Sequence, residues 1–151
     1  EDEKRFYQRN LTRKGNYSLN MVARNVGVRN FDKFHNAGYK GLYAGETKMI
    51  ADLFEKLGAK RKKLRYREDI LDNMNEDELV ANLFRINQTK QKLLKDKVLG
   101  ENNASDIHYE VGKKVRKAIK DIGGTMPEDM PTPKKSLKEL GKENKKLKIT
   151  N

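Results

Sequence analysis

The sequence predicts an all-α fold: a compact bundle of five to seven short helices, with a Pro-containing linker to a C-terminal helix or tail. Apolar residues recur at intervals of three and four along most of the 151 residues, which is the period of an amphipathic helix. Glycines and short polar segments separate these stretches. The chain has no cysteine, so disulfides and Cys-ligated zinc contribute nothing to its stability.

Three regions are expected from the composition along the chain. The N-terminal helix is interrupted by Gly15, and Ser18 has the character of a helix N-cap. A second short helix should run from about Asn30 to Gly38, and the Gly- and Tyr-containing segment 38–45 should form tight turns. These boundaries divide the chain into a charged N-terminal extension (1–17), a helical domain (18–124), and a Pro-containing linker with a basic C-terminal helix or tail (125–151).

The other helices follow from apolar spacing and from capping residues. An amphipathic stretch ends at Gly58, and a longer helix should begin at Asn75 and reach about Val98. A further helix is expected after Ser105, and the pair of glycines that begins at Gly123 should end it.

Positive charge is concentrated in two segments. The net charge is +12, and residues 59–67 carry six basic residues without an acidic one, while residues 132–151 carry seven lysines and two glutamates. Dense positive charge favours phosphate contacts, and an interleaved tyrosine can stack on an unpaired base. A second basic face lies opposite the apolar stripe of the helix after Ser105, although each segment alone also fits an ordinary solvated surface. The candidate nucleic-acid-binding residues are Lys60, Arg61, Lys62, Lys63, Arg65, Tyr66, Arg67, Lys113, Arg116, Lys117 and Lys120.

No catalytic machinery is recognisable, so the chain is not expected to be an enzyme. The two histidines, His35 and His108, are far apart in sequence, and no pair has the spacing of metal ligands. The acidic residues from Asp69 to Glu78 stand at a helix N-terminus, where capping and the helix dipole account for them. We therefore expect no metal, no cofactor and no small-molecule substrate. No apolar run approaches the length of roughly 20 residues that crosses a bilayer, so no membrane association is expected.

Three stretches of sequence resemble the C-terminal portion of the bacterial DNA-damage-inducible protein D family. They are FHNAGYKGLY at 34–43, DILD at 69–72 followed by ELVANLFR at 78–85 and the Gln-Thr pair at 88–89, and HYEVGKKVR at 108–116 followed by GGTMPEDMPTP at 123–133. The resemblance covers roughly residues 18–140. The amino-terminal part of the family, which looks like a phage-type DNA-binding module, has no counterpart here.

The resemblance implies a cytoplasmic, prophage-related bacterial protein of the SOS response, with single-stranded DNA or a recombinase filament as partner. It carries over no catalytic residue. A second hypothesis is a protein–protein or oligomerisation module without direct DNA contact. In that case the chain would form a homodimer or pack on another protein through a partner interface at Leu137, Leu140 and Leu147.

Overall fold

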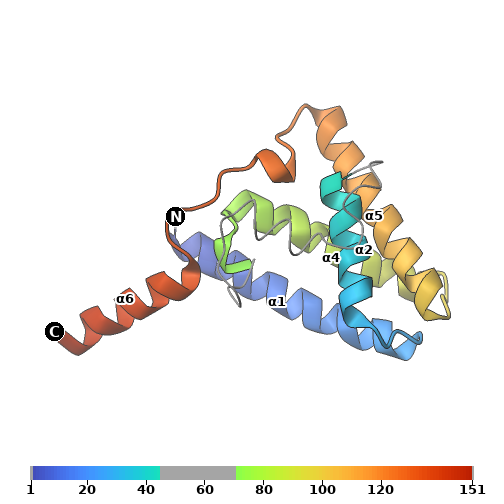
Figure 1. Ribbon diagram of the computed structural model, residues 1–151, viewed down its shortest axis with the longest axis horizontal. Coiled ribbons are helices and arrows are strands. Elements are labelled where there is room, and N and C mark those ends of the chain that lie inside the picture. The colour runs from blue at the N-terminus through green and yellow to red at the C-terminus, as the bar shows by residue number, and fades with distance from the viewer. Residues whose placement is uncertain (1, 45–70, 151) are drawn as a thin grey trace.

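The computed structural model describes residues 2–44 and 71–150, and for residues 44 and 145–150 it describes the backbone alone. This part of the chain forms five α-helices and two short 3-10 turns, with no strand (Figure 1). The all-α prediction is confirmed, although three of the helices are longer than expected. The elements are α1 (Asp2–Asn25), α2 (Phe31–Ala44), η2 (Leu71–Asn73), α4 (Glu76–Lys95), α5 (Glu101–Ile122), η3 (Pro127–Asp129) and α6 (Leu137–Thr150).

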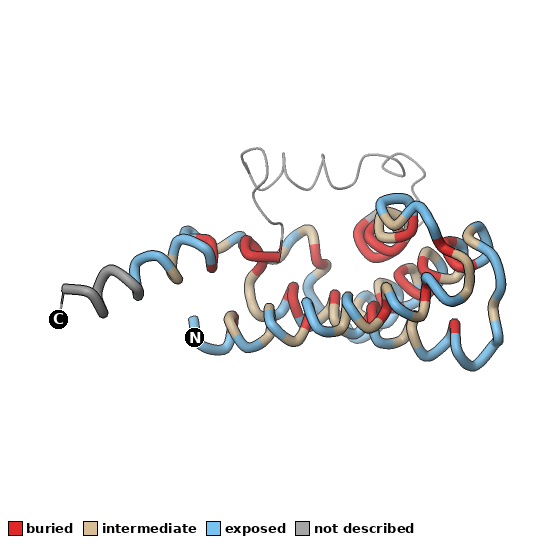
Figure 2. The backbone as a smooth tube through the Cα atoms, turned by 90° about the horizontal axis from the view of Figure 1, so that it is seen from below, coloured by how far each residue is buried: buried red, intermediate tan, exposed pale blue. Residues whose placement is uncertain are grey.

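The helices pack in pairs. The most extensive contacts join α2 to α5 and α1 to α4, while α4 and α5 form a hairpin that connects the two pairs. In both views, α6 leads away from this bundle (Figures 1 and 2). The amphipathic stretch predicted before Gly58 lies outside the described residues.

The first helix corrects two predictions. α1 runs without a break through Gly15 and Ser18, so Gly15 does not end a helix and Ser18 is not an N-cap. A Cβ atom at position 15 would lie 2.9 Å from Cδ1 of Leu83, so the glycine lets α1 approach α4 closely. Contact with a second helix therefore stabilises α1 where local propensity alone predicts an end. The expected N-terminal extension is the first part of this helix.

The second helix corrects the prediction of turns at residues 38–44. α2 continues through Gly38 and Gly41 to Ala44. A Cβ atom at position 38 would collide with the His108 ring, and one at position 41 with the backbone oxygen of Tyr109. On the facing helix, a Cβ at Gly112 would lie 2.7 Å from the backbone oxygen of Gly38. Glycine serves here to bring α2 and α5 together, not to reverse the chain.

The boundaries of the next two helices are partly as predicted. Asn75 caps α4, since its Oδ1 accepts a hydrogen bond of 2.8 Å from the backbone N–H of Glu78. α4 ends at Lys95, earlier than expected. α5 begins at Glu101 and not after Ser105, and Gly123 ends it in the left-handed conformation, with φ of 83°.

Two apolar clusters form the core, joined by the partly buried Ile107, which packs against both. One lies between α2, α4 and α5, and the other between α1, α2, α4 and α5. The first cluster contains Tyr39, Leu42, Tyr43, Leu71, Met74, Leu79, Val111 and Val115, and the second contains Leu19, Ala23, Val28, Phe34, Ile86, Leu93 and Ala104.

Candidate functional site

The structure places the predicted basic residues in different environments. Lys60, Arg61, Lys62, Lys63, Arg65, Tyr66 and Arg67 lie outside the described residues. Of the four on α5, Lys117 and Lys120 are exposed, and the Lys117 ammonium pairs with Asp121 at 2.7 Å. An exposed pair of this kind is easily broken by a competing anion.

Arg116 is engaged within the molecule. Its guanidinium donates to the backbone oxygens of Leu42 and Tyr43 at 3.1 and 2.7 Å, and it pairs with the Glu128 carboxylate at 2.7 Å. It therefore satisfies carbonyls in the last turn of α2, which lack intrahelical partners. Its position is accounted for by this link between α2, α5 and η3.

Lys113 forms part of a cluster that the sequence did not reveal. The ammonium groups of Lys40 on α2 and Lys113 on α5 lie over the Tyr109 ring, 5.2 and 5.5 Å from its centroid. Lys40 and Tyr109 also line an open polar groove of about 610 Å³ between α2 and α5. We refer to Lys40, Lys113 and Tyr109 as the lysine–tyrosine cluster. Because the sequence predicted that α2 ends at Gly38, Lys40 was not recognised as a candidate residue.

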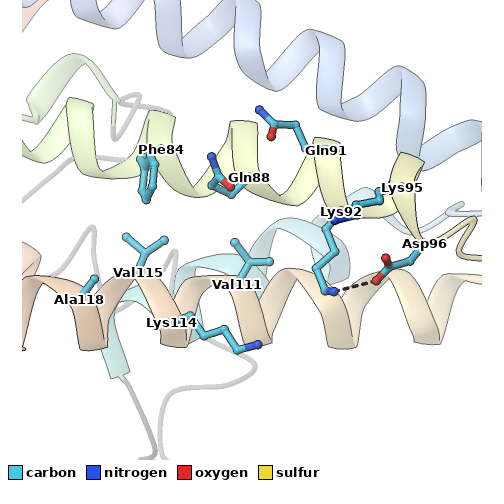
Figure 3. Close-up of a pocket in the computed structure, with 10 residues that line it drawn as sticks. All are labelled: Phe84, Gln88, Gln91, Lys92, Lys95, Asp96, Val111, Lys114, Val115 and Ala118. Carbon is cyan, nitrogen blue, oxygen red and sulfur yellow. Dashed lines mark hydrogen bonds and ion pairs between the residues drawn. The ribbon is translucent and has the colours of Figure 1, made fainter.

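A second groove separates α4 from α5 (Figure 3). It has a volume of about 400 Å³ and an apolar floor formed by Val111, Val115 and Ala118 of α5. Phe84 points into it from α4, and its surface is 52% exposed. Gln88 and Gln91 add amide groups to the α4 side. We call this depression the α4–α5 groove.

The charges that line the α4–α5 groove are mostly positive. Lys92, Lys95 and Lys114 contribute ammonium groups, and Asp96 contributes the one carboxylate among the lining residues. Asp96 pairs with Lys92 at 2.7 Å, and the hydrogen bond from Lys92 lowers the pKa of its carboxyl group. The lining therefore combines apolar surface with excess positive charge, which suits an anionic ligand that also has apolar groups.

The resemblance motifs meet in the interior as a buried polar network. Arg85 and His108 are fully buried, and the Arg85 guanidinium donates to the His108 Nε2 and, at 3.1 Å, to Asn82. Asn82 donates to the Tyr43 hydroxyl at 3.0 Å, which in turn donates to the Glu78 carboxylate at 2.6 Å. The network joins α2, α4 and α5. Its hydrogen bonds hold these helices in one arrangement, although the Arg85 Nε is buried without a hydrogen-bond partner.

The network also fixes the protonation of the histidines. The His108 Nδ1 lies 2.8 Å from the backbone oxygen of Phe34, so this nitrogen donates and Nε2 accepts from Arg85. Burial, and then the nearby Arg85 cation, lower the pKa of His108 well below its usual value. Burial and Arg85 also lower the pKa of His35 to about 4. Both histidines are neutral at pH 7 and pack inside the fold.

A cluster of arginines on α1 surrounds Asp72. Arg9 and Arg13 pair with its carboxylate at 2.6 and 3.3 Å, and the buried Arg5 donates to the backbone oxygens of Asp72, Met74 and Lys135. Asp72 thus has a structural role, because its carboxylate forms ion pairs with two arginines of α1. These ion pairs explain why an acidic residue stands here before α4. Arg5 holds the start of α1 to η2 and to the C-terminal segment.

The three leucines predicted as a partner interface differ in exposure. Leu137 is 1% exposed and packs within this chain, and Leu140 is half-buried. The side chain of Leu147 lies outside the described residues. Within residues 2–44 and 71–150, no group of three or more His, Asp or Glu side chains is placed to hold a metal ion. Over the same ranges, no helix combines the length and the apolar character that a membrane span requires.

Fold and site together define a small helical domain with a buried polar network and two surface grooves. The family model of the DinD C-terminal domain matches residues 1–140, and the chain belongs to this family. The resemblance predicted from the sequence is thereby confirmed. The chain is 44% identical over 143 residues to DNA damage-inducible protein D of Escherichia coli (strain K12). That alignment covers 93% of this chain and 50% of the relative, so the chain spans about half the length of the relative. No solved structure matches the chain.

Proposed function

We propose that this chain is a non-enzymatic regulatory module of the bacterial DNA-damage response, which associates with DNA or with a recombinase–DNA filament through its basic residues. The family membership supports the link to DNA damage, since the E. coli relative is named for induction by it. The net charge of +12 favours a polyanionic partner.

The observation that carries the proposal is the lysine–tyrosine cluster. Two ammonium groups from different helices lie over one aromatic ring, at 5.2 and 5.5 Å from its centroid. Single-stranded nucleic acid is bound by such combinations, because cations contact the phosphates while a ring stacks on a base. The exposed Lys117 and Lys120 extend this surface along α5. In the sequence, residues 60–67 carry six further basic residues.

The test is binding of a fluorescein-labelled oligothymidylate to the full chain, measured by anisotropy across salt concentrations. Each phosphate contact with a single strand contributes about −0.7 to the slope of log K against log salt. The variant Lys40→Gln/Lys113→Gln should therefore bind more weakly, with a slope that is shallower by about 1.4. Replacing Lys60, Arg61, Lys62 and Lys63 together by Ala should weaken binding further.

The matched control is Lys95→Gln/Lys114→Gln, which removes the same charge at the α4–α5 groove. It should leave the salt slope close to that of the unchanged chain. Absence of oligothymidylate binding at low salt would refute the proposal, as would equal losses in the two double variants. The second outcome would mean that total charge, and not this surface, determines binding.

A protein–protein module remains the second candidate function, and one observation favours it. In the α4–α5 groove, Phe84 and Ala118 are exposed, and Phe84 projects into the groove above the buried Val111 and Val115.

A further inference from the structure

We propose that the α4–α5 groove binds an acidic, amphipathic helical segment of a partner protein. This inference goes beyond the proposed association with DNA, because it requires no contact with DNA and uses different residues, and it specifies the partner of the second candidate function.

The shape and apolar surface of the groove suit a helix. It lies between two helices that follow one another in the chain and contact each other, so a third helix placed in it would pack against both. Phe84 is 52% exposed, and Val80, one turn earlier on the same side of α4, is 45% exposed. Across from them, Val111 and Val115 form an aliphatic floor. An exposed aromatic side chain beside an apolar floor is typical of a site that anchors apolar side chains.

The charge of the lining specifies an acidic occupant. Three lysines stand around the groove, and the carboxylate of Asp96 is already paired with Lys92. Glutamate or aspartate side chains beside the apolar face of a bound helix would meet Lys95 and Lys114. Opposite potentials across such an interface raise the association rate and select the partner.

The two basic segments of this chain do not have the chemistry of the occupant. Residues 60–67 contain six basic residues and no acidic one. α6 contains five lysines and two glutamates. Either segment, whether from the same chain or from a second copy of it, would place further positive charge beside the three lysines of the groove. The charge of the lining therefore matches neither basic segment and complements an acidic segment of a partner protein.

The lining also favours a peptide over a nucleic acid. Val111, Val115 and Ala118 offer no flat face on which a base could stack, and Phe84 is the one aromatic residue among the lining residues. The lysine–tyrosine cluster, which has the character of a nucleic-acid contact, belongs to the α2–α5 side of the bundle.

The probe is a fluorescein-labelled peptide of about five helical turns, roughly 18 residues, with leucine at intervals of three and four and glutamate elsewhere. Anisotropy against the full chain at low salt should show saturable binding that weakens as salt is added. Phe84→Ala should weaken it about tenfold, as expected for an anchor residue. Lys95→Gln/Lys114→Gln should also weaken it, whereas Lys40→Gln/Lys113→Gln, with the same change in charge, should not.

A second variant distinguishes loss of binding from a folding defect caused by Phe84→Ala. Ala118 is exposed on the floor of the groove, so Ala118→Glu leaves the core intact and places a carboxylate where the acidic peptide would lie. It should abolish binding while the helical circular dichroism and its thermal midpoint stay unchanged.

Several outcomes would overturn the proposal. These are no binding of the acidic peptide, equal binding of a peptide with lysine in place of glutamate, and equal losses in the two lysine variants. Displacement of the peptide by oligothymidylate, with loss of oligothymidylate binding in Phe84→Ala, would assign the groove to nucleic acid instead. The double variant that tests DNA binding is the control for peptide binding, and the reverse also holds. Failure of one proposal therefore does not contradict the other.

Discussion

His35 shows how a single residue is determined by its surroundings. Its Nε2 lies 2.7 Å from the Asn20 Oδ1, which can only accept, so this ring nitrogen donates. The edge of the Phe34 ring and the His108 ring lie next to it, with centroids 5.6 and 6.2 Å away. Protonation would add a second cation near Arg85. These surroundings explain why His35 stays neutral.

The free energy of unfolding should fall as the pH is lowered from 7 to 5. Burial and Arg85 lower the folded-state pKa of His35 from 6.5 to about 4, although Asp32 opposes this. As the pH falls below 6.5, His35 therefore binds a proton in the unfolded chain but not in the folded chain. The contribution of His35 to stability is fully present above pH 6.5 and is lost as the pH falls toward 4. For His35 alone the loss is about 2 kcal/mol between pH 7 and pH 5.

Urea unfolding at the two pH values measures this loss. In His35→Gln the difference between pH 7 and pH 5 should shrink by about 2 kcal/mol, leaving the part due to His108. An unchanged difference in the variant would show that His35 is not buried as a neutral ring.

At the scale of helices, the contact of α2 with α5 depends on the absence of side chains. The backbone oxygen of Tyr109 occupies the space that a Cβ at position 41 would need. Because this oxygen belongs to a helix backbone, it cannot move without separating the two helices. Arg116 and the lysine–tyrosine cluster both bridge the same pair of helices, so their geometry depends on this close approach.

Gly41→Ala should therefore destabilise the fold by about 1–3 kcal/mol, the usual cost of overpacking a tight contact. Gly141→Ala on α6 is the matched control, since a Cβ there would meet nothing within 4 Å. The control should be neutral or slightly stabilising, because alanine has the higher helix propensity. Urea unfolding of both variants measures the difference, and equal stabilities would contradict the packing described for α2 and α5.

Helices whose ends are specified locally could be predicted from the sequence, and others could not. Asn75 and Glu78 are neighbours, so the start of α4 was visible in its cap. In the sequence, Gly15, Gly38 and Gly41 resemble helix ends. A glycine can end a helix or allow a second helix to pack closely, and the sequence alone does not distinguish the two roles. Their meaning depends on Leu83, His108 and Tyr109, which belong to helices far along the chain.

The surface sites were less predictable for the same reason. The basic face of α5 was recognised because its period lies within one helix. Lys40 meets Lys113, and Phe84 faces Val115, only once the helices have packed. Arg116 was predicted to contact phosphate, and nothing local in the sequence indicates that it binds the end of α2 instead.

For the molecule as a whole, Arg5 connects segments from the two ends of the described chain. Its guanidinium donates to Lys135 at 3.1 Å and to Asp72 and Met74 at 3.4 Å, so α1, η2 and the segment before α6 meet at one side chain. Ser136 follows and caps α6, accepting from the backbone N–H of Glu139 at 3.1 Å. The docking of the C-terminal segment thus depends on the first turns of α1.

Arg5→Met should destabilise the fold by about 2 kcal/mol, since three backbone carbonyls, two of them in buried hydrogen bonds, lose a charged donor. Amide hydrogen exchange at Glu139 and Leu140 should become faster, because the start of α6 is no longer held. Arg24→Met, on the exposed part of the same helix, should cost less than about 1 kcal/mol and leave these amides unchanged. Equal exchange rates in both variants would mean that the C-terminal segment docks without Arg5.

The buried polar network has a consequence for how this family diversifies. Glu78, Asn82, Arg85 and His108 belong to the stretches by which the chain is recognised, and all four lie inside the bundle. Selection for folding alone is sufficient to retain them. Lys40, Lys113 and Lys114 stand in the same stretches but outside the network. Their replacement would change what the two surfaces bind, while the network, and the fold that depends on it, stayed intact.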